Sequence, residues 1–257
     1  PAPTAIRQAA PVAGSSKMGD ADCPARAQDV PVKFLEQVMY DLRRAGIEPY
    51  AWVVNQSLAA IGREYRGTAD VYHVAHVLHR KVGLDRIRGS RKYALDGLKI
   101  AVQTGCHTLW PSDVYTVKED NPYYPTMLKE LCEATGATVP HYSRLESCCG
   151  MGGMRSTDVE KSLALFREKL VSIKEETDAD LIVTTCSSCF LQFDMSQPIL
   201  RERGMIDFEP IPTFYYTQLL ALVMGCDPAQ VVAISQIDRS AVIAEIQSEQ
   251  RLIKEVA

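Results

Sequence analysis

From residue 98 onward, short apolar runs alternate with longer stretches whose apolar residues recur every three or four positions. The runs at 98–104 (LKIAVQT), 138–142, 181–185 (LIVTT) and 210–213 predict β-strands. The stretches at 126–135, 214–224 and 240–256, and a long one that begins at 157, have the period of amphipathic helices. Because strands alternate with helices, the sequence predicts an α/β fold with a parallel sheet and right-handed crossovers.

The helix that begins at residue 157 has the clearest pattern. Thr157, followed three residues later by Glu160, predicts a capping box at its N-terminus. The predicted buried stripe consists of Val159, Leu163, Phe166, Leu170 and Ile173. One face of this helix is therefore expected to belong to the core.

The chain before residue 98 has a different character. Residues 1–30 are rich in Pro, Ala, Gly and Ser without hydrophobic periodicity, which predicts an extended arm or linker. Residues 31–97 are expected to be mainly helical. The α/β module would then cover residues 98–235, and residues 236–257 would add a C-terminal helix.

Composition and charge exclude some classes of protein. Of the 257 residues, 46% are apolar and 23% charged, as in ordinary globular domains. The formal net charge of -4 lacks the basic surplus of a nucleic-acid binder. No apolar run approaches the roughly 20 residues of a membrane span, and no signal-peptide pattern is visible. The sequence therefore predicts a cytoplasmic protein, or one peripheral to a membrane complex.

The cysteines point to the chemistry. A chain this large and apolar does not need a disulfide framework. Its clustered cysteines therefore indicate metal binding, an iron–sulfur cluster or redox chemistry. Cys106 and Cys186 each follow a predicted strand, and the pair Cys148-Cys149 follows the strand between them by a short loop. Ligands of open α/β sheets gather beyond the carboxyl ends of the strands. We therefore expect these thiols, with Cys189, to converge at one edge of the sheet.

The spacing of the five cysteines, C-x41-CC-x36-C-x2-C, favours an iron–sulfur cluster over zinc. Structural zinc takes four ligands, usually from two short Cys pairs, and only one C-x-x-C is present here. The adjacent thiols of Cys148 and Cys149 can more easily reach different metal atoms of a cluster, and clusters tolerate irregular spacing. Gly150, Gly152 and Gly153 would let the backbone approach inorganic sulfide closely.

Three segments carry a family resemblance: GCH at 105–107, SCCGMGGMRS at 147–156 and VTTCSSCFLQFD at 183–194. They resemble the CCG, or cysteine-rich, module of the heterodisulfide reductase B-subunit and its relatives, including the heterodisulfide reductase-like proteins of sulfur oxidisers. The resemblance implies a Rossmann-like module. It also implies one noncubane 4Fe–4S cluster bound by Cys106, Cys148, Cys149, Cys186 and Cys189, one of them bridging. In that family such clusters serve disulfide cleavage.

The sequence departs from the family pattern before Leu98, where it has only Cys23 and no CCG. Only the second of the family's two modules is evident. The expected role is therefore an oxidoreductase subunit for thiol/disulfide chemistry or electron transfer, with a disulfide, thiol or lipoyl-type substrate. Since no G-x-G-x-x-G fingerprint follows a strand, electrons are expected from partners, namely an electron-carrying iron–sulfur subunit and a flavin subunit.

Two further residues are candidates for catalysis. His107, next to a predicted ligand, could protonate a departing thiolate, and Arg155 could hold a substrate carboxylate or offset cluster charge. Each also has a structural alternative, a hydrogen bond for His107 and loop bracing for Arg155. For the whole chain the alternatives are a cluster-free dithiol oxidoreductase that uses Cys186 and Cys189, and a zinc-stabilised scaffold subunit.

Overall fold

The computed structural model describes residues 46, 49–64, 72–109, 120–232 and 234–253. The expected arm at 1–30 and Cys23 lie outside these residues. The chain divides into two compact units, Pro1–Val71 and Tyr72–Ala257. In the first unit, helix α3 (Pro49–Leu58) continues into the 3-10 helix η2 (Ala59–Ile61), which ends at Gly62 with a left-handed φ of 66°.

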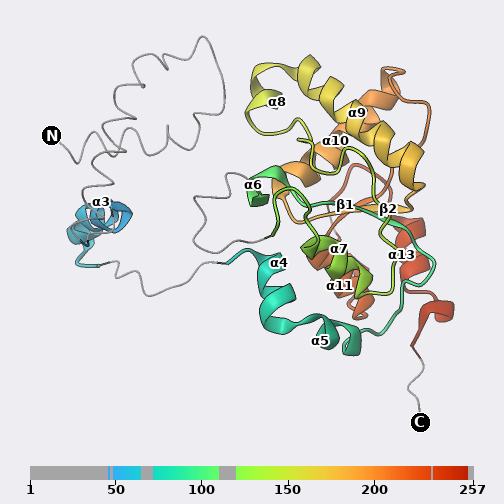
Figure 1. Ribbon diagram of the computed structural model, residues 1–257, viewed down its shortest axis with the longest axis horizontal. Helices are drawn as coiled ribbons and strands as arrows, with labels where there is room; N and C mark the ends of the chain where they lie inside the picture. The colour runs from blue at the N-terminus through green and yellow to red at the C-terminus, as the bar shows by residue number, and fades with distance from the viewer. Residues whose placement is uncertain (1–45, 47–48, 65–71, 110–119, 233, 254–257) are drawn as a thin grey trace. The chain divides into compact units, whose positions relative to one another are not determined.

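The second unit holds the sheet and most of the helices (Figure 1). Its strands are β1 (Ile100–Gln103), β2 (Leu181–Thr184) and β3 (Thr213–Tyr215). Its α-helices are α4 (Val74–His76), α5 (Leu84–Gly89), α6 (Cys106–Leu109), α7 (Met127–Glu133), α8 (Gly153–Thr157), α9 (Val159–Thr177), α10 (Ser187–Glu202), α11 (Tyr216–Val223), α12 (Pro228–Val231) and α13 (Ser240–Ile246). A π-helix, η3 (Val77–Val82), follows α4, and a 3-10 helix, η4 (Glu249–Arg251), follows α13.

The three strands form one parallel sheet in the order β1-β2-β3. Val183 in β2 lies opposite Val102 in β1 and Phe214 in β3. Every residue of β1 and β2 is buried, as expected for strands covered on both faces. The prediction of an α/β fold with a parallel sheet and flanking helices is confirmed.

Successive residues of a strand point to opposite faces of the sheet, and this alternation creates two cores. Ile100 and Val102 belong to one core, which is formed with α7, α11 and α13. Ala101 and Ile182 belong to the other, which is formed with α9 and α10. Figure 1 shows these two groups of helices on opposite sides of β1 and β2.

The prediction of a strand at 138–142 is wrong. Only Thr138 pairs, as an isolated parallel bridge to Lys99. The bridge uses the Thr138 N–H to the Leu98 carbonyl (2.9 Å) and the Ile100 N–H to the Thr138 carbonyl (2.8 Å). Pro140 has no N–H to donate, so it cannot continue a ladder there.

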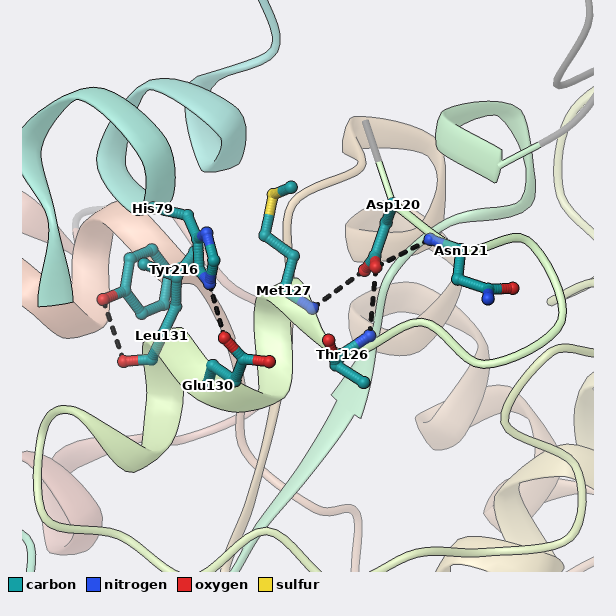
Figure 2. Close-up of polar contacts among 8 residues, drawn as sticks. All are labelled: His79, Asp120, Asn121, Thr126, Met127, Glu130, Leu131 and Tyr216. Carbon is teal, nitrogen blue, oxygen red and sulfur yellow. Dashed lines mark hydrogen bonds and ion pairs between the residues drawn. The ribbon is translucent and has the colours of Figure 1, made fainter. Parts of the chain in front are cut away.

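Helix α7 is amphipathic as predicted, since Met127, Leu128 and Leu131 are buried on one face. Its first turn is held by Asp120 rather than by its own N-cap, as Figure 2 shows: the Met127 N–H donates to Asp120 Oδ2 at 2.8 Å. Glu130 in the same helix contacts His79 of η3, with 2.6 Å between Oε2 and Nε2 (Figure 2). These contacts fix α7 to η3, which precedes β1, and to Asp120, which follows β1 in the chain.

Helix α9 is a long helix as predicted, but the predicted cap is wrong. Asp158 is the N-cap, and its carboxylate accepts a hydrogen bond from the Lys161 N–H at 2.9 Å. The Thr157 hydroxyl instead donates to the Gly153 carbonyl within α8. The predicted stripe is buried from Leu163 to Ile173, whereas Val159 is exposed because it lies in the first turn.

Replacing Asp158 by alanine is expected to lower the free energy of unfolding by about 1 kcal/mol, the usual cost of losing an N-cap acceptor. Urea unfolding of the metal-free protein measures this. The control is Glu160→Ala, which removes only an exposed ion pair with Arg203 and should cost at most about 0.5 kcal/mol. Equal losses in the two variants would contradict the assignment of the cap.

Candidate functional site

Two of the candidate cysteines follow adjacent strands. Cys106 is the first residue of α6, just after β1, and Cys186 is the N-cap of α10, just after β2. Gly105 allows the two segments to meet: its φ is +95°, and a Cβ there would lie 2.8 Å from the Cβ of Cys186. A side chain at position 105 would therefore push these two segments apart.

The other candidates come from the loop before α8 and the first turn of α10. Cys148 is exposed, whereas Cys149 and Cys189 are buried. The Gly150 N–H donates to the Cys148 sulfur at 3.4 Å. The Met151 N–H donates to Cys149. Backbone N–H groups thus point at two of the sulfurs, where they favour negative charge.

The structure brings the five thiols together in a continuous row. Cys149 Sγ and Cys189 Sγ lie 3.3 Å apart. Side-chain hydrogen bonds also join Cys106 to Cys148, Cys148 to Cys149, and Cys189 to Cys186. We call this set, in the order 106, 148, 149, 189 and 186, the thiol row. None of the five forms a disulfide bond.

The contacts within the thiol row shift the pKa values of its thiols in opposite directions. Hydrogen bonds from Cys106 and Cys149 lower the pKa of Cys148 to about 2. The same bonds raise the pKa of Cys106, and they raise that of Cys149 to about 11. Contacts with Cys149 and Cys186, together with burial, raise the pKa of Cys189. Because metals bind the thiolate, loading this site would release protons.

The residue types of the thiol row suit a soft metal, but the distance between two of its sulfurs is too short for one. Five thiols can supply thiolate ligands to iron or zinc, and the two backbone N–H groups stabilise negative sulfur. However, two sulfurs on one tetrahedral metal lie about 3.8 Å apart when each bond is about 2.3 Å, and Cys149 and Cys189 are closer than that. Within the described residues, no three Cys, His, Asp or Glu side chains are placed to hold one metal ion. The sulfurs must therefore spread to admit a metal.

Gly150 holds the loop of the adjacent cysteines against α9. Its φ is +83°, and a Cβ there would lie 2.6 Å from the Ser162 carbonyl oxygen. The Gly150 carbonyl accepts a hydrogen bond from the Ser162 hydroxyl at 2.7 Å. Only glycine combines this backbone conformation with so close a contact.

A chain of hydrogen bonds between polar side chains connects Ser162 to Arg155. Gln192 Nε2 donates to Ser162 Oγ at 3.1 Å, and Ser196 Oγ donates to Gln192 Oε1 at 3.2 Å. An Arg155 guanidinium nitrogen donates to Ser196 Oγ at 3.2 Å. The contacts of Arg155 thus brace α8 against α10.

The remaining candidates are Gly152, Gly153 and His107. Gly152, with φ +70°, is the N-cap of α8, and Gly153 is the first residue of that helix. No atom lies within 4 Å of a Cβ built at Gly152. The backbone of His107 lies in α6, next to Cys106, but its side chain is outside the described part of the chain.

Three residues of the site were not predicted. Gln103 Nε2 donates to the Cys189 sulfur at 3.7 Å, and the buried Tyr142 hydroxyl donates to the Val102 carbonyl at 2.8 Å. Lys169 of α9 donates to carbonyls of the loop before Cys148. Of the three, Lys169 had a signal in the sequence, because a lysine three residues after Phe166 falls on the buried face of α9.

Comparisons with known proteins show which proteins the chain is similar to. Residues 100–194 match the CCG family, described as a cysteine-rich domain. The chain is 52% identical, over 77% of its length, to a heterodisulfide reductase B-subunit-like protein of Archaeoglobus profundus. It is 37% identical, over 75% of its length, to the B-subunit of a ferredoxin/F420H2-dependent CoB-CoM heterodisulfide reductase of Methanosarcina acetivorans. It is 27% identical, over 71% of its length, to the membrane anchor subunit of an 8-methylmenaquinol:fumarate reductase of Wolinella succinogenes.

The matches cover only part of these relatives: 66%, 64% and 61% of their own lengths, so the chain spans just under two thirds of each. No helix in the described part of the chain is long and apolar enough to cross a membrane. The matched domain contains all five members of the thiol row. The chain belongs to the heterodisulfide reductase B-subunit-like proteins with a CCG cysteine-rich domain.

Proposed function

We propose that this chain is the iron–sulfur subunit of a heterodisulfide reductase-like complex. Cys106, Cys148, Cys149, Cys186 and Cys189 would bind one noncubane 4Fe–4S cluster, and Gly150, Gly152 and Gly153 would let the backbone fold around it. The observation that carries the proposal is the thiol row, in which sulfurs from three distant segments are in contact. When bound, such a cluster would supply one-electron redox chemistry beside a substrate sulfur.

The chain's own residues would supply a proton and hold the substrate. Cleavage of a disulfide consumes two electrons and two protons and yields two thiols. His107 would give a proton to the departing thiolate, and Arg155 would brace the loop or hold a substrate carboxylate. The electrons would come through an electron-carrying iron–sulfur subunit and a flavin subunit. The substrate would be a disulfide, a thiol or a lipoyl-type dithiol.

A cluster-free dithiol oxidoreductase is the second candidate. One observation favours it: Cys186 is the N-cap of α10 and shares a hydrogen bond with Cys189, the arrangement of a C-x-x-C redox pair. This function would not require Cys106 or Cys148. The cluster uses all five thiols, and we therefore prefer it.

Metal analysis separates these functions. The chain is purified without oxygen, and iron, acid-labile sulfide and zinc are assayed per chain. The cluster predicts about four irons with matching sulfide. About one zinc per chain would instead support a zinc-stabilised scaffold. A protein with neither metal, but with a reversible Cys186–Cys189 disulfide, would support the dithiol enzyme.

A further inference from the structure

Lys169 lies in the middle of α9, and its side chain is 0% exposed. Its Nζ donates to three backbone carbonyls: Arg144 at 2.5 Å, Leu145 at 3.0 Å and Ser147 at 2.8 Å. All three belong to the loop that leads directly into Cys148. One buried side chain therefore fixes the path of the loop before the adjacent cysteines.

The number of acceptors indicates the charge of this side chain. An ammonium group has three N–H donors, and Lys169 has three carbonyl acceptors within hydrogen-bond distance. A neutral amine has only two N–H donors and could not donate to all three carbonyls. Burial lowers the pKa of Lys169 to about 8, while the nearby thiols of Cys189, Cys149 and Cys148 act in the opposite direction. At pH 7 the group is therefore mainly a cation.

A buried cation needs a compensating negative charge. Among the described residues, no carboxylate forms an ion pair with Lys169; its hydrogen bonds go to uncharged carbonyls. The groups whose negative charge would raise the pKa of Lys169 are, in order, Cys189, Cys149 and Cys148 of the thiol row, and then Glu146. The thiolates that a loaded site requires would therefore supply the negative charge that this cation lacks.

We infer that Lys169 is a positioning residue of this site. Its ammonium ties residues 144–147 to α9, so that Cys148 and Cys149 meet the rest of the thiol row, and its charge offsets the negative charge of the loaded site. Only the second role rests on the proposed cluster. Because reduction adds negative charge, a nearby cation stabilises the reduced form and makes the reduction potential less negative.

The first role is tested on the full metal-free chain. The N–H groups of Leu145 and Ser147 are bonded inside the loop, to the carbonyls of Tyr142 and Arg144. In Lys169→Met, their hydrogen exchange should be about tenfold faster or more, because the loop loses its anchor. The Ile182 N–H, bonded to the Pro212 carbonyl, reports on the sheet and should be unchanged. The matched control is Lys161→Met, at an exposed position of the same helix.

A second measurement needs no stable Lys169→Met variant. In the wild-type metal-free chain, NMR should show a slowly exchanging lysine ammonium signal at pH 7, absent from Lys169→Arg and retained in Lys161→Met. The absence of such a signal, or equal loop exchange in Lys169→Met and wild type, would overturn the anchoring role.

The charge role is tested on the loaded protein by redox titration. Lys169→Met should have a more negative reduction potential than wild type, and Lys169→Arg, which keeps the charge, should restore it toward the wild-type value. If wild type holds a cluster and the three potentials agree, the charge role is wrong while the cluster stands. If wild type holds no cluster, the charge role is wrong together with the proposed function, and the loop measurements still decide the anchoring role.

Discussion

Replacing Cys149 by serine is expected to reduce bound iron from about four per chain to less than about one. Cys149 lies in the middle of the thiol row, in contact with both Cys148 and Cys189, and serine offers a hard oxygen that iron–sulfur clusters bind poorly. Cys148→Ser should have the same effect. Iron and acid-labile sulfide, assayed after anaerobic purification, measure the loss.

The matched control for these variants is Cys226→Ser. Cys226 is an exposed free cysteine outside the thiol row, so this variant should keep its full iron content. Thermal unfolding of the metal-free variants checks that serine, which is nearly the same shape as cysteine, leaves the fold intact. If Cys149→Ser retained all its iron with an unchanged spectrum, Cys149 would not be a ligand and the five-cysteine site would be wrong.

Gly150→Ala is expected to lower the free energy of unfolding of the metal-free chain by about 2–4 kcal/mol, and to prevent cluster retention as well. The alanine Cβ would lie 2.6 Å from the Ser162 carbonyl oxygen, and φ is +83°. To relieve the overlap, the loop must move away from α9, carrying Cys148 and Cys149 with it. Urea unfolding and iron content measure the two effects.

A second glycine separates overlap from backbone strain. Gly204 also has a positive φ, +65°, but no atom lies within 4 Å of a Cβ built there. Gly204→Ala should therefore cost only about 1 kcal/mol and leave iron binding unchanged. Similar losses of stability in both variants would show that contact with Ser162 does not matter, and full iron in Gly150→Ala would show that the loop tolerates displacement.

The sequence predicted strands correctly where every residue of the strand is buried. The runs at 98–104 and 181–185 predicted β1 and β2 because strands covered on both faces are apolar throughout. The run at 138–142 looked similar, but it contains Pro140 and pairs only at Thr138. Because proline cannot donate to a ladder, Pro140 was the signal in the sequence against a strand at this run.

The residues around the thiol row were harder to predict than the cysteines themselves. Cysteine spacing is visible in the sequence, whereas the role of Lys169 becomes clear only when the carbonyls of residues 144, 145 and 147 are seen to converge on it. Lysine is usually exposed, so its position on the buried face of α9 was easily overlooked. Asp158 was missed for a related reason, since Thr157 next to it is an equally suitable cap by residue type.

The closeness of the sulfurs has a consequence for handling the protein in air. Cys149 Sγ and Cys189 Sγ are 3.3 Å apart, and a small rotation would bring them to the roughly 2.05 Å of a covalent S–S bond. Cys148 adds an exposed thiolate, the form that oxidants attack first. Dissolved oxygen is therefore expected to crosslink the empty site and block later reconstitution, and a reductant should be present from cell lysis onward.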